Sequence, residues 1–209
     1  MHNENLEDWY YFSSPVYKIK LERYLQLLKD VSEQYDEHDL EIDEIYPIEQ
    51  SKSFELDESI SDFVKDVSQT GWNILDAQGY DMDNLKVYVG ELWSQTHHKY
   101  SSMDVHTHGY GSQLSAFYIL DCNEDSPKLC IHDPRPTKTQ VELPEKFSTD
   151  VKFSTRVIEF DLEPGLLFIT NSWLPHSFTR NRSDEPFKII HINMFVENVV
   201  ENDQLPIVI

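Results

Sequence analysis

Short runs rich in β-branched and aromatic residues, each closed by a turn signal, fill the sequence from position 85 to position 196. The runs that we interpret as strands are 86–93, 114–120, 128–132, 156–160, 166–170 and 187–196. Glycine, proline and asparagine mark turns between them, at 109–111, 123–127, 134–136, 163–165 and 181–186. Several short strands with this spacing predict a β-sandwich or a β-barrel.

The first third of the chain has helical spacing instead. Apolar residues recur at helical intervals between positions 21 and 31, which predicts a first helix. A second helix is expected over 59–67, and a third should follow Gly71 and end at Gly79. Helices followed by strands favour a mainly β or α+β class over a doubly wound parallel sheet.

A chain of 209 residues is long enough for one well-buried core, so we expect a single domain. Residues 1–84 would form a helical and acidic support region, and residues 85–200 the β core. The acidic segment 33–58 has few apolar anchors, and we expect a solvated excursion around a short extended piece at 45–48.

Acidic residues outnumber basic ones by 38 to 17, which gives a formal net charge of −21. Such a surface repels phosphate backbones and anionic lipid heads, so we expect no nucleic-acid or membrane partner. Solubility is the simpler interpretation of the acidity, and attraction of a basic partner is the alternative. The pattern leaves open whether the chain forms a homodimer.

The cysteines and the N-terminus bear on the cellular setting. Only Cys122 and Cys130 occur, and they suggest no disulfide framework, which favours reduced thiols in the cytoplasm. Residues 1–8 are polar and acidic, and the chain lacks an apolar run of about 18 residues. We therefore expect neither a signal peptide nor a membrane span.

Two histidines stand one residue apart in the segment Asp104-Val105-His106-Thr107-His108-Gly109, just before a predicted strand. Residues i and i+2 of an extended chain share a face, so both imidazoles can point to one place. This arrangement suits metal ligands. An isolated His-x-His pair is weak evidence, however, because exposed loops often hold histidines by chance.

A third histidine follows later in the chain. A Pro164-Gly165 turn begins an apolar strand that ends in an aromatic loop, and His176 stands directly after Pro175. The proline fixes the local conformation, so this loop can supply a third ligand. Three neutral imidazoles on one face would suit Fe, Zn, Cu or Ni, and catalysis would need open coordination positions.

The predicted strand 187–196 carries Lys188 near its start. A cation inside a strand is costly unless an anion pairs with it, and a carboxylate ligand beside the metal would supply that anion. Alternatively, Lys188 occupies a solvent-facing edge position, and spacing alone does not distinguish the two. His191 alternates with Lys188 and should face the other side.

These three segments together resemble the Fe(II)/2-oxoglutarate oxygenase superfamily, in particular a group found often in tailed phages and marine bacteria. The resemblance runs from about position 85 to position 196. That group shows a His-x-His-Pro-x-Ser-x-Leu-Ser-Gly-x-Tyr-Tyr run, an Asp-Pro-Arg, a Pro-Gly-x-Leu-x-x-Phe-x-x-x-Leu-x-His run and an Arg-x-Ser-x-x-Phe-Asn strand. The corresponding segments here are 106–118, 133–135, 164–176 and 188–193.

The resemblance implies a double-stranded β-helix, a cupin-like jelly-roll, with flanking N-terminal helices. His106, His108 and His176 would hold one Fe(II), which 2-oxoglutarate would chelate through its 2-oxo acid end. Lys188 would bind the distal carboxylate of this co-substrate, and Asn193 would also contribute to cofactor binding. Tyr118 would be either a second donor or a core residue, which is the commoner role in such a strand.

Asn171 and Asn193 would orient neighbouring groups by hydrogen bonds. The implied reaction is activation of O2, decarboxylation of 2-oxoglutarate to succinate, and hydroxylation of a C–H bond in a peptidyl or small-molecule substrate. A phage-encoded member would act in the host cytoplasm.

Two departures from the family pattern affect the expected chemistry. Superfamily members usually have a carboxylate where His108 stands, although His-x-His is common in the subgroup. A site of three imidazoles carries one negative charge fewer, which shifts redox behaviour and metal preference. Lys188 replaces an arginine, which keeps the charge but loses the bidentate fork.

Two other classes of protein fit the same residues. One is a three-histidine, cupin-like metal dioxygenase that uses no 2-oxoglutarate. The other is a non-catalytic jelly-roll, a structural or sugar-binding module whose histidines are incidental. Metal content separates the last from both enzymes, and 2-oxoglutarate binding separates the two enzymes from each other.

Overall fold

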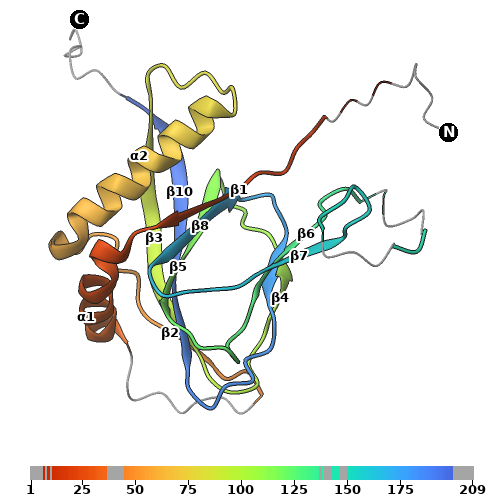
Figure 1. Cartoon of the computed structure of the whole chain (residues 1–209). Coiled ribbons are helices and arrows are strands. Elements are labelled where there is room, and N and C mark those ends of the chain that lie inside the picture. Colours follow the sequence, from red (N-terminus) through yellow and green to blue (C-terminus); the bar gives the residue numbers. More distant parts are fainter. Residues whose placement is uncertain are drawn as a thin grey trace, which may run out of the picture.

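The computed structural model describes residues 7, 9, 11–36, 45–136, 138, 143–145 and 150–199. Two antiparallel sheets face each other in this part of the chain, and helices cover the outer face of the larger sheet (Figure 1). The larger sheet has the strand order β1-β8-β5-β10-β3-β2, and the smaller sheet has the order β4-β9-β6-β7. The predicted mainly β class, a double-stranded β-helix with flanking N-terminal helices, is confirmed.

Strand bounds follow the order of the chain. The larger sheet contains β1 Val16–Lys20, β2 Ile48–Gln50, β3 Leu85–His97, β5 Leu114–Asp121, β8 Leu166–Asn171 and β10 Phe187–Asn198. The smaller sheet contains β4 Met103–His106, β6 Leu129–His132, β7 Val157–Phe160 and β9 His176–Phe178. The six predicted strands correspond to β3, β5, β6, β7, β8 and β10, whereas β1, β4 and β9 were not predicted.

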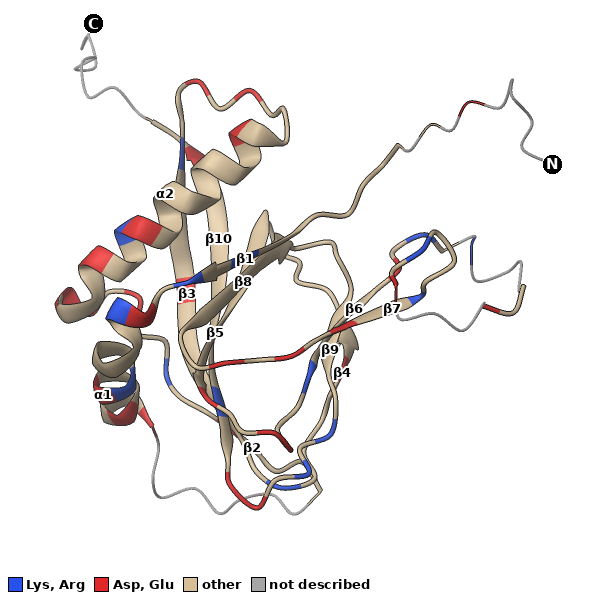
Figure 2. Ribbon diagram, in the orientation of Figure 1, with Lys and Arg blue, Asp and Glu red and all other residues tan. Residues whose placement is uncertain are grey.

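The helices precede most of the sheet. A 3-10 turn, η1 Glu22–Tyr24, leads into α1 Leu25–Tyr35, and a second, η2 Glu58–Ile60, leads into α2 Ser61–Ala77. None of the helices in the described part of the chain has the length and apolar character that crossing a membrane requires. Many of the Asp, Glu, Lys and Arg residues lie on these helices and on the loops (Figure 2).

The prediction of two separate helices around Gly71 was wrong, because α2 runs through this glycine without a break. A Cβ at position 71 would lie 2.9 Å from Met194 Sδ and 3.1 Å from Val87 Cγ1. Gly71 therefore lets the helix lie close against the sheet, and this packing outweighs the low helix propensity of glycine.

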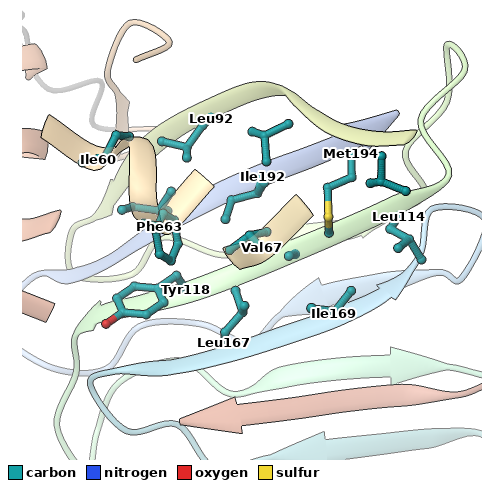
Figure 3. Close-up of a cluster of buried hydrophobic side chains, with 14 of the residues drawn as sticks. Ile60, Phe63, Val67, Leu92, Leu114, Tyr118, Leu167, Ile169, Ile192 and Met194 are labelled. Carbon is teal, nitrogen blue, oxygen red and sulfur yellow. The ribbon is translucent and has the colours of Figure 1, made fainter. Parts of the chain in front are cut away.

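The larger sheet separates two hydrophobic cores. The helix-side core includes Phe63, Val67, Ala116, Tyr118, Leu120, Ile190, Ile192 and Met194. Figure 3 labels Phe63, Val67, Tyr118, Ile192 and Met194 among its members. The interior core, between the sheets, includes Phe117, Ile119, Leu129, Ile131, Phe168, Phe178, Phe187 and Ile189. Neighbouring residues of β5 and β10 thus alternate between the two cores, as strand geometry requires. This alternation decides which side chains can reach a site inside the jelly-roll.

Candidate metal centre

The three predicted ligand histidines meet at one end of the smaller sheet. His106 ends β4 and His176 begins β9, and the two are paired directly across these antiparallel strands. His108 follows in a loop whose backbone is fixed, because its N–H donates to the carbonyl of Ser172 at 2.9 Å. One ring nitrogen of each histidine lies within 4.8 Å of those of the other two.

The loop backbone orients two of the rings. The Nδ1–H of His106 donates to the carbonyl oxygen of Asp104 at 2.8 Å, and the Nδ1–H of His176 donates to that of Leu174 at 3.0 Å. A carbonyl oxygen can only accept, so each Nδ1 carries the proton and each Nε2 keeps its lone pair. Both rings are therefore in the tautomer that a metal ligand needs.

A side-chain amide orients the third ring. Asn193 Nδ2 donates to Glu91 Oε2 at 2.6 Å, which leaves Asn193 Oδ1 to accept from His108 Nδ1 at 2.5 Å. Asn193 therefore lies beside His108 and orients its ring, while its assignment to cofactor binding stays a prediction. The carboxylate of Glu91 therefore polarises His108 indirectly, through the side-chain amide of Asn193 that lies between them.

The arrangement fits a divalent transition metal. The Nε2 atoms of His108 and His176 are buried and have no hydrogen-bond partner among the described residues. An unpaired buried polar atom costs about 1–3 kcal/mol, and a metal ion would remove that cost. Three imidazoles suit iron, and equally zinc, nickel or copper, so the ligand set alone does not choose the metal.

Burial keeps these ligands neutral. Desolvation lowers the pKa of His176 to about 3, and it also lowers the pKa of His108, with a smaller contribution from the neighbouring His106. A protonated imidazole cannot bind a metal. Both ligands are therefore neutral near pH 7, with lone pairs ready to coordinate.

The structure does not bring Lys188 to the triad. Its side chain is on the helix side of β10, where Nζ pairs with Asp36 Oδ2 at 2.6 Å beside the end of α1. Strand alternation explains this placement, because Lys188 shares a face with Ile190 and Ile192 of the helix-side core. The anion that compensates its charge is Asp36, and His191 lies on the opposite face, as expected.

Tyr118 is also on the helix side. Its ring packs edge-on against Phe63 with centroids 5.5 Å apart, and its hydroxyl donates to the carbonyl of Leu21 at 3.0 Å (Figure 3). Burial raises the pKa of Tyr118 to about 12. This side chain joins α2 and the η1 segment to the sheet, far from the interior face that a co-substrate would contact.

A cavity of about 680 Å³ opens beside the triad. Its lining includes His106 and His108, together with Glu91, Trp93, Gln95, Asp104, His191 and Asn193. The roles of the inward-facing residues of β3 were missed, although alternation along 91–97 could have indicated them. The predicted strand stopped at position 93, so Gln95 and His97 were not assigned to a face.

A second cavity, of about 420 Å³, reaches His108 from the direction of α2. It is mostly apolar, and its lining includes Leu75, Tyr80, Met82, Trp173 and Val196. His108 therefore lines both cavities, and the smaller one is the more apolar of the two.

Comparison with known proteins shows what the chain is similar to. A family model described as "Putative 2OG-Fe(II) oxygenase" matches residues 91–191, which contain all three histidines. No curated protein sequence matches the chain. The narrower subgroup of phages and marine bacteria stays a prediction.

Solved structures share the fold. A Pseudomonas putida prolyl-4-hydroxylase has a TM-score of 0.59 at 10% identity, over 88% of this chain and 94% of that one. A 2OG-Fe(II) oxygenase family oxidoreductase from Burkholderia pseudomallei has a TM-score of 0.59 at 10% identity, over 86% and 84%. HygX from Streptomyces hygroscopicus, with nickel, 2-oxoglutarate and hygromycin B bound, has a TM-score of 0.56 at 12% identity, over 87% and 83%.

Three observations agree: the jelly-roll topology, the matched segment 91–191, and three imidazoles that could hold one metal ion. Residues 91–191 match the model of the 2OG-Fe(II) oxygenases, enzymes that use Fe(II), 2-oxoglutarate and O2, and the chain shares the jelly-roll fold of solved proteins of that kind.

Proposed function

We propose that His106, His108 and His176 hold the Fe(II) of a hydroxylase that acts on a C–H bond of a peptidyl or small-molecule substrate. The observation that carries the proposal is the convergence of three imidazoles whose Nδ1 atoms are all engaged by oxygen acceptors. Iron with 2-oxoglutarate activates O2 for such a hydroxylation, in which one oxygen atom enters the substrate and the other enters succinate, with release of CO2.

The protein's own contribution is to orient and to desolvate. The carbonyls of Asp104 and Leu174 and the amide of Asn193 hold the three rings in the coordinating tautomer. His176 is fully buried, and Phe117 lies 4.8 Å from its ring, which keeps water away from that side of the site. Three protein ligands leave coordination positions open for the reactants.

The apolar cavity beside His108 supports a substrate that inserts an apolar group. Aromatic and aliphatic side chains line it, including Trp173 and Met82, and its volume of about 420 Å³ suits a group of the size of a few side chains. A prolyl-4-hydroxylase and a hygromycin B-bound protein share this fold, so the fold accepts both substrate kinds. We assign the target C–H bond to this apolar cavity beside His108.

Anaerobic addition of Fe(II) and then 2-oxoglutarate tests the proposal. We expect one iron per chain, a visible metal-to-ligand charge-transfer band after 2-oxoglutarate is added, and slow succinate formation once O2 is admitted. His176→Ala should lose the iron and the band. His98→Ala is the matched control, because His98 pairs with Glu49 outside the triad and should keep both.

The same experiment can refute the proposal. If the wild-type protein retains no metal after anaerobic addition of Fe(II), the ligand assignment is wrong. If His176→Ala binds iron as tightly as His98→Ala, the metal is held elsewhere.

A further inference from the structure

The cavity that would receive the co-substrate contains no lysine or arginine among its described lining residues. Its two charged residues, Glu91 and Asp104, are both acidic and both exposed. Lys188 is on the other face of β10, held by Asp36. The distal carboxylate of 2-oxoglutarate therefore needs donors other than a basic side chain.

The cavity wall does contain unused donors. The indole Nε1 of Trp93 and both ring nitrogens of His191 are buried and have no hydrogen-bond partner among the described residues. His191 is 1% exposed, and a neutral imidazole always carries one N–H. Both residues line the same cavity as His106 and His108. Buried polar groups without partners in a cavity indicate a ligand or ordered water.

The two donors are held together as a stack. The rings of Trp93 and His191 lie 5.2 Å apart with an interplanar angle of 11°, and the ring of His191 lies 6.5 Å from that of His108, also at 11°. The stack begins at a metal ligand and leads away from it along the wall of the cavity. The donors therefore lie in the same cavity as the candidate ligands His106 and His108.

Gln95 adds a third donor. Its Oε1 accepts from His97 Nε2 at 3.3 Å, so the amide NH2 is the end left to donate. Gln95 is 3% exposed and lines the cavity next to Trp93 in the alternation of β3. An ionised carboxylate only accepts hydrogen bonds, so it can accept from these neutral N–H groups of Trp93, His191 and Gln95.

Charge balance supports neutral donors at this position. In an oxygenase whose ligands are two histidines and one carboxylate, the charges of Fe(II), that carboxylate and dianionic 2-oxoglutarate add up to −1, and a nearby cationic side chain offsets this charge. With the neutral His108 in the carboxylate position, the charges of Fe(II) and 2-oxoglutarate already cancel. Glu91 and Asp104 are exposed, so solvent screens their charges.

We propose that Trp93 and His191, assisted by the amide of Gln95, bind the distal carboxylate of 2-oxoglutarate in place of an arginine or lysine. This inference rests on the proposed metal site. It predicts an uncharged subsite, which binds the distal carboxylate less tightly than a bidentate guanidinium does.

Binding of two 2-oxo acids to the anaerobic Fe(II) protein tests the inference. The probes are 2-oxoglutarate and 2-oxopentanoate, which share the chelating end and the chain length but differ in the distal carboxylate. The readout is the charge-transfer band, not turnover. Trp93→Phe keeps the aromatic ring and removes the N–H, and it should weaken 2-oxoglutarate binding by about 10- to 100-fold while leaving 2-oxopentanoate binding unchanged.

Matched variants separate this effect from a general loss of structure. Trp72→Phe removes an indole N–H that donates to the carbonyl of Leu85 outside the cavity, and it should change neither affinity. His191→Phe, which also retains a ring, should reproduce the selective loss.

Three results would overturn the inference. One is equal weakening of both 2-oxo acids by Trp93→Phe, and another is no weakening of either. The third is a protein that binds Fe(II) but gives no band with 2-oxoglutarate, which would leave the metal site standing. A protein that binds no Fe(II) would instead refute the proposed function.

Discussion

Asn193 links Glu91 to His108, the proposed metal ligand, and removal of that link should weaken metal binding. Its amide accepts from His108 Nδ1 at 2.5 Å and donates to Glu91 Oε2 at 2.6 Å. Asn193→Ala leaves the imidazole N–H without its acceptor, so the ring can rotate or take the other tautomer. Loss of such an outer partner typically costs about 10- to 100-fold in metal affinity, or about 1.4–2.7 kcal/mol.

Glu91→Gln should have a smaller effect. The glutamine still accepts a hydrogen bond from Asn193, so the ring keeps its orientation and only the polarising charge is lost. A charge-assisted hydrogen bond is roughly twice as strong as a neutral one, so we expect a decrease of about 3- to 10-fold in metal affinity. Glu49→Gln is the matched control, since it removes a carboxylate that pairs with His98 outside the triad.

The assay is anaerobic titration with Fe(II) in competition with a chromophoric chelator, at one pH and ionic strength for all variants. Urea unfolding of the metal-free proteins shows whether each variant still folds. The expected order of affinity is wild type equal to Glu49→Gln, then Glu91→Gln, then Asn193→Ala. If Asn193→Ala binds within about twofold of the wild type, the second-sphere link has no energetic role. If Glu49→Gln weakens binding as much as Glu91→Gln, the effect is one of overall charge.

Two further predictions concern residues away from the triad. Lys188→Met should leave the affinity for 2-oxoglutarate within about twofold of the wild type, because the Lys188 ammonium pairs with Asp36 on the helix side of the sheet. A selective loss of 2-oxoglutarate affinity in the charge-transfer titration would contradict that placement. His97 has its pKa lowered to about 4 by burial, so below pH 6.5 only the unfolded chain gains this proton. The wild type should therefore lose about 1.4 kcal/mol more stability per pH unit than His97→Phe between pH 6.5 and 4, and parallel urea-unfolding profiles would refute this.

Local sequence signals were enough to predict the larger strands, since runs of β-branched residues identified β3, β5, β8 and β10. The His-x-His pair and the later Pro-His loop only suggested possible ligands, and the family resemblance combined the three histidines into one predicted site. The short strands β4 and β9 were missed because they contain only four and three residues. Their pairing aligns His106 with His176, and sequence reveals such non-local pairing only when a family pattern suggests it.

Long-range packing explains the remaining errors. Glycine at position 71 predicts the end of a helix. In the structure, however, Gly71 lies where α2 packs closely against Met194 and Val87, and Met194 is far away in the sequence. For Lys188 the sequence left open a ligand carboxylate as partner or a solvent-facing edge position, and the anion instead comes from Asp36 at the end of α1. In both cases the deciding neighbour belongs to another element, which no local pattern contains.

The two departures from the family pattern at this site compensate each other electrostatically. A carboxylate ligand adds one negative charge near the metal, and a basic residue in the co-substrate subsite balances it. His108 removes that negative charge, and the described cavity lining lacks the basic residue. Because isolated charge is costly in a partly buried site, either change alone would leave a net charge that the cavity cannot solvate fully. An imidazole in the carboxylate position is therefore consistent with a working oxygenase when the co-substrate subsite is neutral as well.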